Sequence, residues 1–134
     1  MKTNFSTPKV PISWGELIDK ITILEIKHTN ISSPAAQENL IKELQLLSAI
    51  VDENTGLLEL VKIYRQELKA VNSQLWIVED DIRDKELKSE FDTVFVELAR
   101  SVYRLNDIRA QIKQSINSVL NSEIVEVKSY KAFQ

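Results

Sequence analysis

Cysteine is absent from this chain of 134 residues, and histidine occurs once, as His28. The lack of cysteine excludes disulfide bonds, thiol catalysis and thiolate metal sites. A single histidine excludes a metal centre built on several histidines of one chain, although carboxylate sites remain open. No metal site and no cofactor is assigned. No apolar run approaches the roughly 20 residues that a membrane-spanning helix needs, and the first residues lack the apolar core of a signal peptide. We therefore expect a cytoplasmic protein without a membrane partner.

Basic residues are neither in excess nor clustered. The chain has 17 lysines and arginines against 20 acidic residues, which gives a net charge of −3. Neutralising the phosphates of duplex nucleic acid needs a concentrated basic face, so duplex nucleic acid is not expected as a partner. The 43% of hydrophobic residues is typical of a folded domain, and the chain is long enough to form a core without disulfides or metals.

Glycine and proline are scarce. The two glycines are Gly15 and Gly56, and the last of three prolines is Pro34. A sequence so poor in turn-forming residues predicts long helices. Pro8 and Pro11 predict an extended arm over residues 1–12, because each disfavours helix at the residue before it. Apolar and polar residues alternate over 123–133, so residues 123–134 are assigned to an extended tail and 13–122 to a single helical domain.

Two helix starts carry recognisable caps. Ser13 and Glu16 have the spacing of a capping box, in which each side chain satisfies a backbone N–H of the first turn, so Glu16 is expected to act as a cap. Ser33 precedes Pro34, which suits the first position of a helix. This second helix is predicted to end near Asp52.

Two long segments carry apolar residues in steps of three and four, as in a coiled coil. The rows are Leu57, Val61, Tyr64, Leu68, Val71, Leu75, Val78 and Ile82, and then Phe91, Phe95, Leu98, Val102, Leu105, Ile112, Ile116 and Val119. The polar run 83–90 separates the rows, which predicts an antiparallel hairpin of about residues 56–88 and 90–118, with Thr55 as the first cap. We predict an all-α helical bundle of about four helices, built on this coiled-coil-like hairpin.

The first predicted helix is apolar on two sides. One stripe contains Leu17, Ile21, Leu24 and Ile31, and a second contains Ile23 and Ile26. Such a helix is buried between partners, within the chain or across an oligomer, and we predict a homodimer with two-fold symmetry. Asp19 and Lys20 border these stripes, where desolvation would affect either charge. His28 is expected to be a hydrogen-bonded residue of the core or its rim.

Polar residues also follow the predicted hairpin. They fall on one flank of each helix, as Trp76, Asp80 and Arg83 and as Arg100, Tyr103 and Asp107. We expect Asp80 to pair with Arg100, and Arg109 with Glu67. These pairs are interpreted as structural ion pairs that set register or partner choice. The alternative is a pocket for a small anion or a phosphorylated ligand, held by the arginines in bidentate fashion.

Four strings of the sequence resemble an uncharacterised, domain-of-unknown-function family of small proteins from bacteria and phages. They are PISWGELIDKITILEIK, LWIVEDDIRD, ELARSVYRLNDIRA and VEVKSY, and they extend from Pro11 to Tyr130. The resemblance implies no activity. It adds weight to the polar members of the strings, which are Trp14, Glu16, Asp19, Lys20, Trp76, Asp80, Arg83, Arg100, Tyr103, Asn106, Asp107 and Arg109.

The sequence favours a non-enzymatic, self-associating interaction module, with a polar strip that binds a protein partner or a small anion. The candidate binding residues are Trp14, Asp19, Lys20, Trp76, Asp80, Arg83, Arg100, Tyr103, Asp107 and Arg109, and no catalytic residue is assigned. One alternative is a helical, Mg²⁺-dependent nucleotide pyrophosphohydrolase, suggested by the carboxylate spacing in 16–19 and 81–84. Another is a chorismate-mutase-like enzyme, in which Arg83, Arg100 and Arg109 would converge on a dicarboxylate.

Overall fold

A computed structural model describes residues 3–128 of the chain. It contains five helices, which are α1 (Trp14–Asn30), α2 (Pro34–Asp52), α3 (Leu57–Leu60), α4 (Lys62–Leu87) and α5 (Thr93–Val119). No strand occurs within 3–128, and 74% of these residues are helical. The prediction of an all-α fold is confirmed, with one short helix, α3, more than the four expected.

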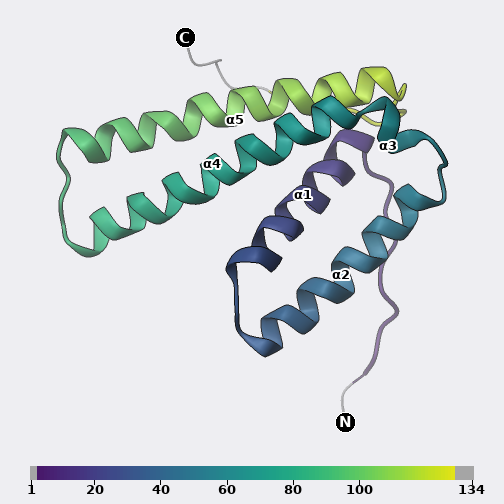
Figure 1. The fold of residues 1–134 in the computed structure, drawn as a ribbon, viewed down its shortest axis with the longest axis horizontal. Helices are drawn as coiled ribbons and strands as arrows, with labels where there is room; N and C mark the ends of the chain where they lie inside the picture. The colour runs from purple at the N-terminus through teal and green to yellow at the C-terminus, as the bar shows by residue number, and fades with distance from the viewer. Residues whose placement is uncertain (1–2, 129–134) are drawn as a thin grey trace.

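The two longest helices, α4 and α5, lie side by side and run antiparallel (Figure 1). The turn between them contains residues 88–92, at the end of the polar run, and Lys85 Nζ of α4 donates hydrogen bonds across it to Glu90 (3.0 Å) and Asp92 (2.9 Å). Asp92 also caps α5 by accepting from the backbone N–H of Phe95 at 3.0 Å. Hydrogen bonds to Asp92 and Glu90 raise the pKa of Lys85, while those from Phe95 and Lys85 lower the pKa of Asp92.

The start of the hairpin differs from the prediction. Thr55 does not cap the helix; instead Gly56, with φ of 86°, occupies the N-cap of α3 and provides no side-chain hydrogen bond. The expected continuous helix from residue 56 is interrupted at Val61, which separates α3 from α4 and is wholly buried. Gly56 adopts its left-handed backbone without the steric cost that a residue with a Cβ atom would meet.

The caps of α1 and α2 follow the sequence. Ser13 Oγ accepts from the backbone N–H of Glu16 at 3.1 Å, and Ser33 Oγ accepts from that of Ala36 at 3.5 Å. Only half of the predicted capping box forms, because the Glu16 carboxylate binds Lys113 of α5. α1 packs on α4 and α5, whereas α2 packs mainly on α1.

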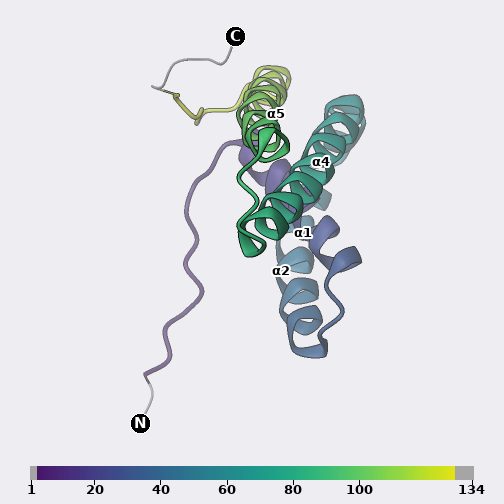
Figure 2. The same ribbon diagram turned by 90° about the vertical axis from the view of Figure 1, so that its left-hand side faces the viewer.

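Figures 1 and 2 show α1 and α2 on one side of the hairpin, with the turn end of the hairpin projecting past them. The core lies where α1 meets the hairpin, and its members are Leu17, Ile18, Ile21, Val51, Leu57, Val61, Leu68, Val71, Ile112 and Ile116. His28 is exposed in the last turns of α1, so the prediction of a core position for it is wrong. Within residues 3–128, no helix has the length and apolar content to cross a membrane.

Candidate functional site

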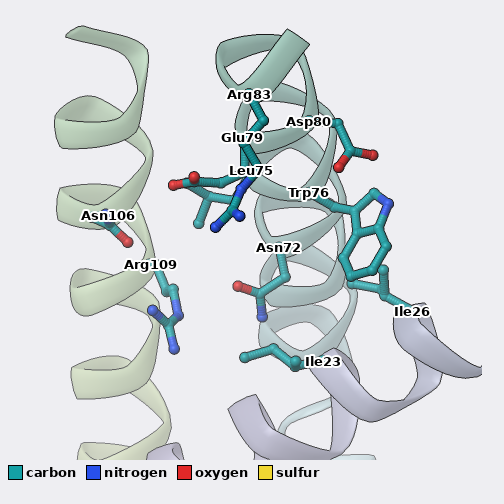
Figure 3. Close-up of a pocket in the computed structure, with 10 residues that line it drawn as sticks. All are labelled: Ile23, Ile26, Asn72, Leu75, Trp76, Glu79, Asp80, Arg83, Asn106 and Arg109. Atoms are coloured by element: carbon teal, nitrogen blue, oxygen red, sulfur yellow. The ribbon is translucent and has the colours of Figure 1, made fainter. Parts of the chain in front are cut away.

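A groove of about 470 Å³ opens where α1, α4 and α5 meet. We call it the polar groove (Figure 3), and its lining residues are Ile23, Ile26, Asn72, Leu75, Trp76, Glu79, Asp80, Arg83, Asn106 and Arg109. Pockets of a few hundred Å³ that combine an apolar wall with a few polar groups are typical of small-ligand sites. The polar groove is therefore the candidate site of this protein.

A buried carboxylate, Asp19, lies behind the groove. Arg109 donates to it from Nε at 2.9 Å and from Nη2, so that the contact is bidentate. Asn72 Nδ2 donates to the same carboxylate at 2.9 Å and to Thr22 Oγ1 at 2.9 Å. Thr22 in turn donates its hydroxyl proton to the Asp19 carbonyl at 2.8 Å. Asp19 and Thr22 are fully buried, and their hydrogen bonds join α1, α4 and α5.

This network of hydrogen bonds compensates the buried negative charge of Asp19. A carboxylate removed from water is costly unless it is paired and hydrogen-bonded, and Asp19 has both kinds of partner. Among the described residues, no buried side-chain nitrogen or oxygen lacks a hydrogen bond. The hydrogen bonds to Asp19 raise the pKa of Arg109 above its ordinary value, so its charge is permanent.

Arg109 also faces the groove. Its side chain is 28% exposed, whereas that of Asp19 is 1% exposed. Nε and Nη2 are used by Asp19, and within residues 3–128 no hydrogen bond is made by Nη1. The floor of the groove thus presents part of a guanidinium group held rigidly by a buried carboxylate.

The other lining side chains divide into two groups. In Figure 3, Glu79 and Arg83 point from α4 toward α5, whereas Trp76 and Asp80 lie on the α1 side of α4, beside Ile26. Glu79, Asp80 and Arg83 are exposed, while Trp76 is half-buried. The part between α4 and α5 therefore holds both arginines together with the Glu79 carboxylate, and the part beside α1 offers an aromatic surface next to a carboxylate.

A second buried cation, Lys113, lies near the start of α1. Its Nζ donates to Glu16 at 2.7 Å and to Glu126 at 2.8 Å. Burial by itself lowers the pKa of Lys113, but these hydrogen bonds outweigh it and raise the pKa above its usual value. The hydrogen bond from Lys113 lowers the pKa of Glu126. This cluster attaches the tail to α1 and α5, and residues 129–134 of the predicted tail lie outside the described residues.

The structure brings together part of the predicted site. Trp76, Asp80, Arg83 and Arg109 line the groove, and Asp19 supports Arg109 from behind. The predicted residues that do not line it are Trp14, Lys20, Arg100, Tyr103 and Asp107. Trp14 lies at the other end of α1, where its backbone N–H donates to Ser122 Oγ at 3.3 Å. Lys20 is exposed beside the buried Asp19, so only one of the two charges is desolvated.

The predicted partner of Arg109 is wrong. Arg109 pairs with Asp19 rather than Glu67, because the flank of α5 that carries Arg109 is covered by α1. Arg100 pairs with Glu97 of its own helix at 3.4 Å. The prediction considered only the two helices of the hairpin, whereas the partner of Arg109 comes from α1.

Sequence reasoning missed Asn72 and Thr22 as members of the site. Asn72 precedes Trp76 by four residues, so the polar flank of α4 begins one turn earlier than predicted. That spacing was the available signal for Asn72. Thr22 carried none, because its role depends on the approach of α4 to α1.

The four carboxylates that suggested a Mg²⁺ site do not gather around one point. Glu16 binds Lys113, and Asp19 binds Arg109. Asp81 and Asp84 are exposed on α4. No group of three metal-ligating side chains forms within the described residues. The arginines of the dicarboxylate hypothesis also fail to converge, because Arg100 is not part of the groove.

The comparison with protein families identifies the chain by its sequence. Residues 8–133 match the model of DUF6165, a family of unknown function, and the chain belongs to that family. The resemblance to a domain-of-unknown-function family is thereby confirmed. No curated protein and no solved structure matches the chain.

Proposed function

We propose that this member of DUF6165 is a non-enzymatic helical module that associates with a second copy of itself. The observation that carries the proposal is that the apolar rows of α4 and α5 become more exposed from the α1 end of the hairpin toward the turn. Beside α1, Leu68 and Ile116 are both 0% exposed. Toward the turn the same rows are only half-buried, as at Val78 and Leu98, and Phe91 is 58% exposed.

Two helices alone bury their contact row incompletely, because its outer edges stay open to water where no third helix covers them. Rows of this kind also form the core of four-helix bundles, in which two further helices cover them. Large apolar patches on a protein surface mark interaction sites. Two hairpins packed against each other would form a four-helix bundle and cover the rows, and a two-fold pair is the commonest closed assembly.

The test is the oligomeric state of the full chain. Sedimentation equilibrium from about 1 to 100 μM is expected to fit a monomer–dimer equilibrium, with dimer dominant at tens of micromolar. The melting temperature should rise with protein concentration, because association stabilises the folded state by mass action. A monomer throughout this range, with a constant melting temperature, contradicts the proposal.

We also propose that the polar groove is the surface through which the module contacts a carboxylate, carried by a small anion or by a protein partner. Two cations, Arg83 and Arg109, line the part of the groove between α4 and α5. An arginine fixed by another group binds a carboxylate with little further loss of side-chain entropy. Thermal stabilisation by millimolar malonate tests the small-anion form, and its absence leaves only a protein partner.

A further inference from the structure

One face of the hairpin is left uncovered by α1 and α2. It contains two shallow hollows, of about 440 and 410 Å³, which are lined by residues of α4 and α5 alone. The first lies toward the start of α4, around Tyr64 and Ser115, and the second lies toward the turn, around Ile77 and Ser101. We call the surface formed by the two hollows the open face.

Ile108 separates the two hollows. It lines both of them and is 45% exposed, so it stands as an apolar projection between two depressions. A projection flanked by hollows suits packing in which a side chain of one helix pair fills a hole in another.

The open face carries one charge of each sign. Every lining residue is uncharged except Glu67 in the first hollow and Arg104 in the second. A two-fold axis that runs across the hairpin near Ile108 sets the first hollow of one copy against the second hollow of the other. Glu67 then lies at the level of Arg104 of the other copy, and the contact occurs twice. An axis parallel to the helices would instead place like charges at the same level, which is unfavourable.

We propose that the open face is the self-association surface, and that two copies pack on it in antiparallel orientation with their Ile108 side chains meeting at the two-fold axis. This inference rests on the proposed self-association and assigns its surface and register. The opposite charges support a second copy as the occupant, because a two-fold pair uses the same patch twice and Glu67 of each copy would then face Arg104 of the other.

The absence of cysteine makes the register directly testable. In full-length Ile108→Cys, two thiols at the axis should form an intermolecular disulfide under a mild oxidant at micromolar concentration. Val119→Cys is the matched control, since Val119 is also 45% exposed on α5 and lies 11 residues from Ile108. Eleven residues of helix span about 16 Å, which places the two control thiols about 33 Å apart, far beyond disulfide reach.

Rapid covalent dimerisation of Ile108→Cys, with little of it in Val119→Cys, is the expected result. Equal crosslinking of both variants or of neither, in a protein that sediments as a dimer, overturns the register and leaves self-association standing. A monomeric parent overturns both.

A charge exchange gives an independent measurement. Glu67→Arg and Arg104→Glu should each weaken dimerisation at least about tenfold, and the double variant should regain most of the loss. The proposed contact is contradicted if the single variants dimerise like the parent. It is also contradicted if the double variant dimerises more weakly than either single variant.

Discussion

Arg109 of α5 holds the carboxylate of Asp19 on α1 in a bidentate contact between residues 90 positions apart in the sequence. The partners differ in access to water, since the side chain of Asp19 is 1% exposed and that of Arg109 is 28% exposed. The contact therefore supports the position of α1 on the hairpin while keeping one edge of the guanidinium at the polar groove.

Replacement of Arg109 by Met should destabilise the protein by about 3 kcal/mol, because the buried carboxylate of Asp19 loses its compensating charge. Arg100→Met is the matched control. Arg100 is 48% exposed and pairs with Glu97 on the surface, so its loss should cost no more than about 0.5 kcal/mol. Urea unfolding at pH 7 measures both variants. Equal stabilities for them would show that the Asp19 contact contributes little.

Gly15→Ala should also be destabilising. A Cβ atom at this position would lie 2.5 Å from the backbone oxygen of Lys113 and 2.9 Å from Oδ1 of Asn117. The same Asn117 oxygen accepts the backbone N–H of Gly15 at 2.7 Å, so a shift of α1 also stretches this hydrogen bond. We expect a loss of about 1–3 kcal/mol, as for overpacking of a core.

The control for Gly15→Ala is Gly56→Asn. Nothing lies within 4 Å of a Cβ atom at Gly56, and Asn tolerates the left-handed backbone better than most residues. Thermal unfolding of the two variants should therefore separate crowding from backbone strain. A Gly15→Ala protein that melts with the parent would mean that α1 can withdraw from α5 at no cost.

Local signals in the sequence were sufficient to predict most of the fold. The caps Ser13 and Ser33, the step pattern of the apolar rows and the polar turn depend on residues a few positions apart. Both caps were found where predicted, and the turn lies at 88–92, because α4 continues through the first part of the polar run to Leu87. The break at Val61 was not predicted, because the apolar spacing continues through it. The backbone of Val61 leaves the helical region there, with φ of −113° and ψ of 13°, and apolar spacing does not encode such a change.

The candidate site was only partly predictable for a related reason. Trp76, Asp80 and Arg83 share a flank of one helix, and helical spacing was enough to group them. The partner of Arg109 was not predictable in this way, since it comes from α1, 90 residues away, and depends on which flank α1 covers. Long-range pairs of this kind follow from packing, and no local pattern specifies them.

Glu126→Gln should loosen the tail with a defined dependence on pH. Lys113 lowers the pKa of Glu126, so the stabilisation from this carboxylate is present above its unfolded pKa of about 4.3 and is lost as the pH falls through the lower folded pKa. The Glu126 side chain is 49% exposed, which limits the effect at pH 7 to about 1 kcal/mol or less.

Urea unfolding at pH 7 and pH 3 measures this difference. Glu126→Gln should be less stable than the parent at pH 7, and the difference should shrink toward pH 3 as the parent's carboxylate is protonated. Glu123→Gln, also exposed in the tail, is the control and should match the parent at both values. A Glu126→Gln deficit of the same size at both pH values would point to lost packing instead of lost charge.

Arg83→Met separates binding in the polar groove from folding. Arg83 is exposed, and within residues 3–128 it forms no ion pair, so its replacement should change the free energy of unfolding by no more than about 0.5 kcal/mol. If the groove binds a carboxylate through Arg83 and Arg109, the thermal shift that malonate produces in the parent should disappear in Arg83→Met. Arg100→Met removes an exposed arginine of the same hairpin from outside the groove and should keep the full shift. If Arg83→Met keeps the thermal shift, Arg83 is not part of the site. If both variants lose the shift, malonate binds through the overall charge of the hairpin rather than in the groove.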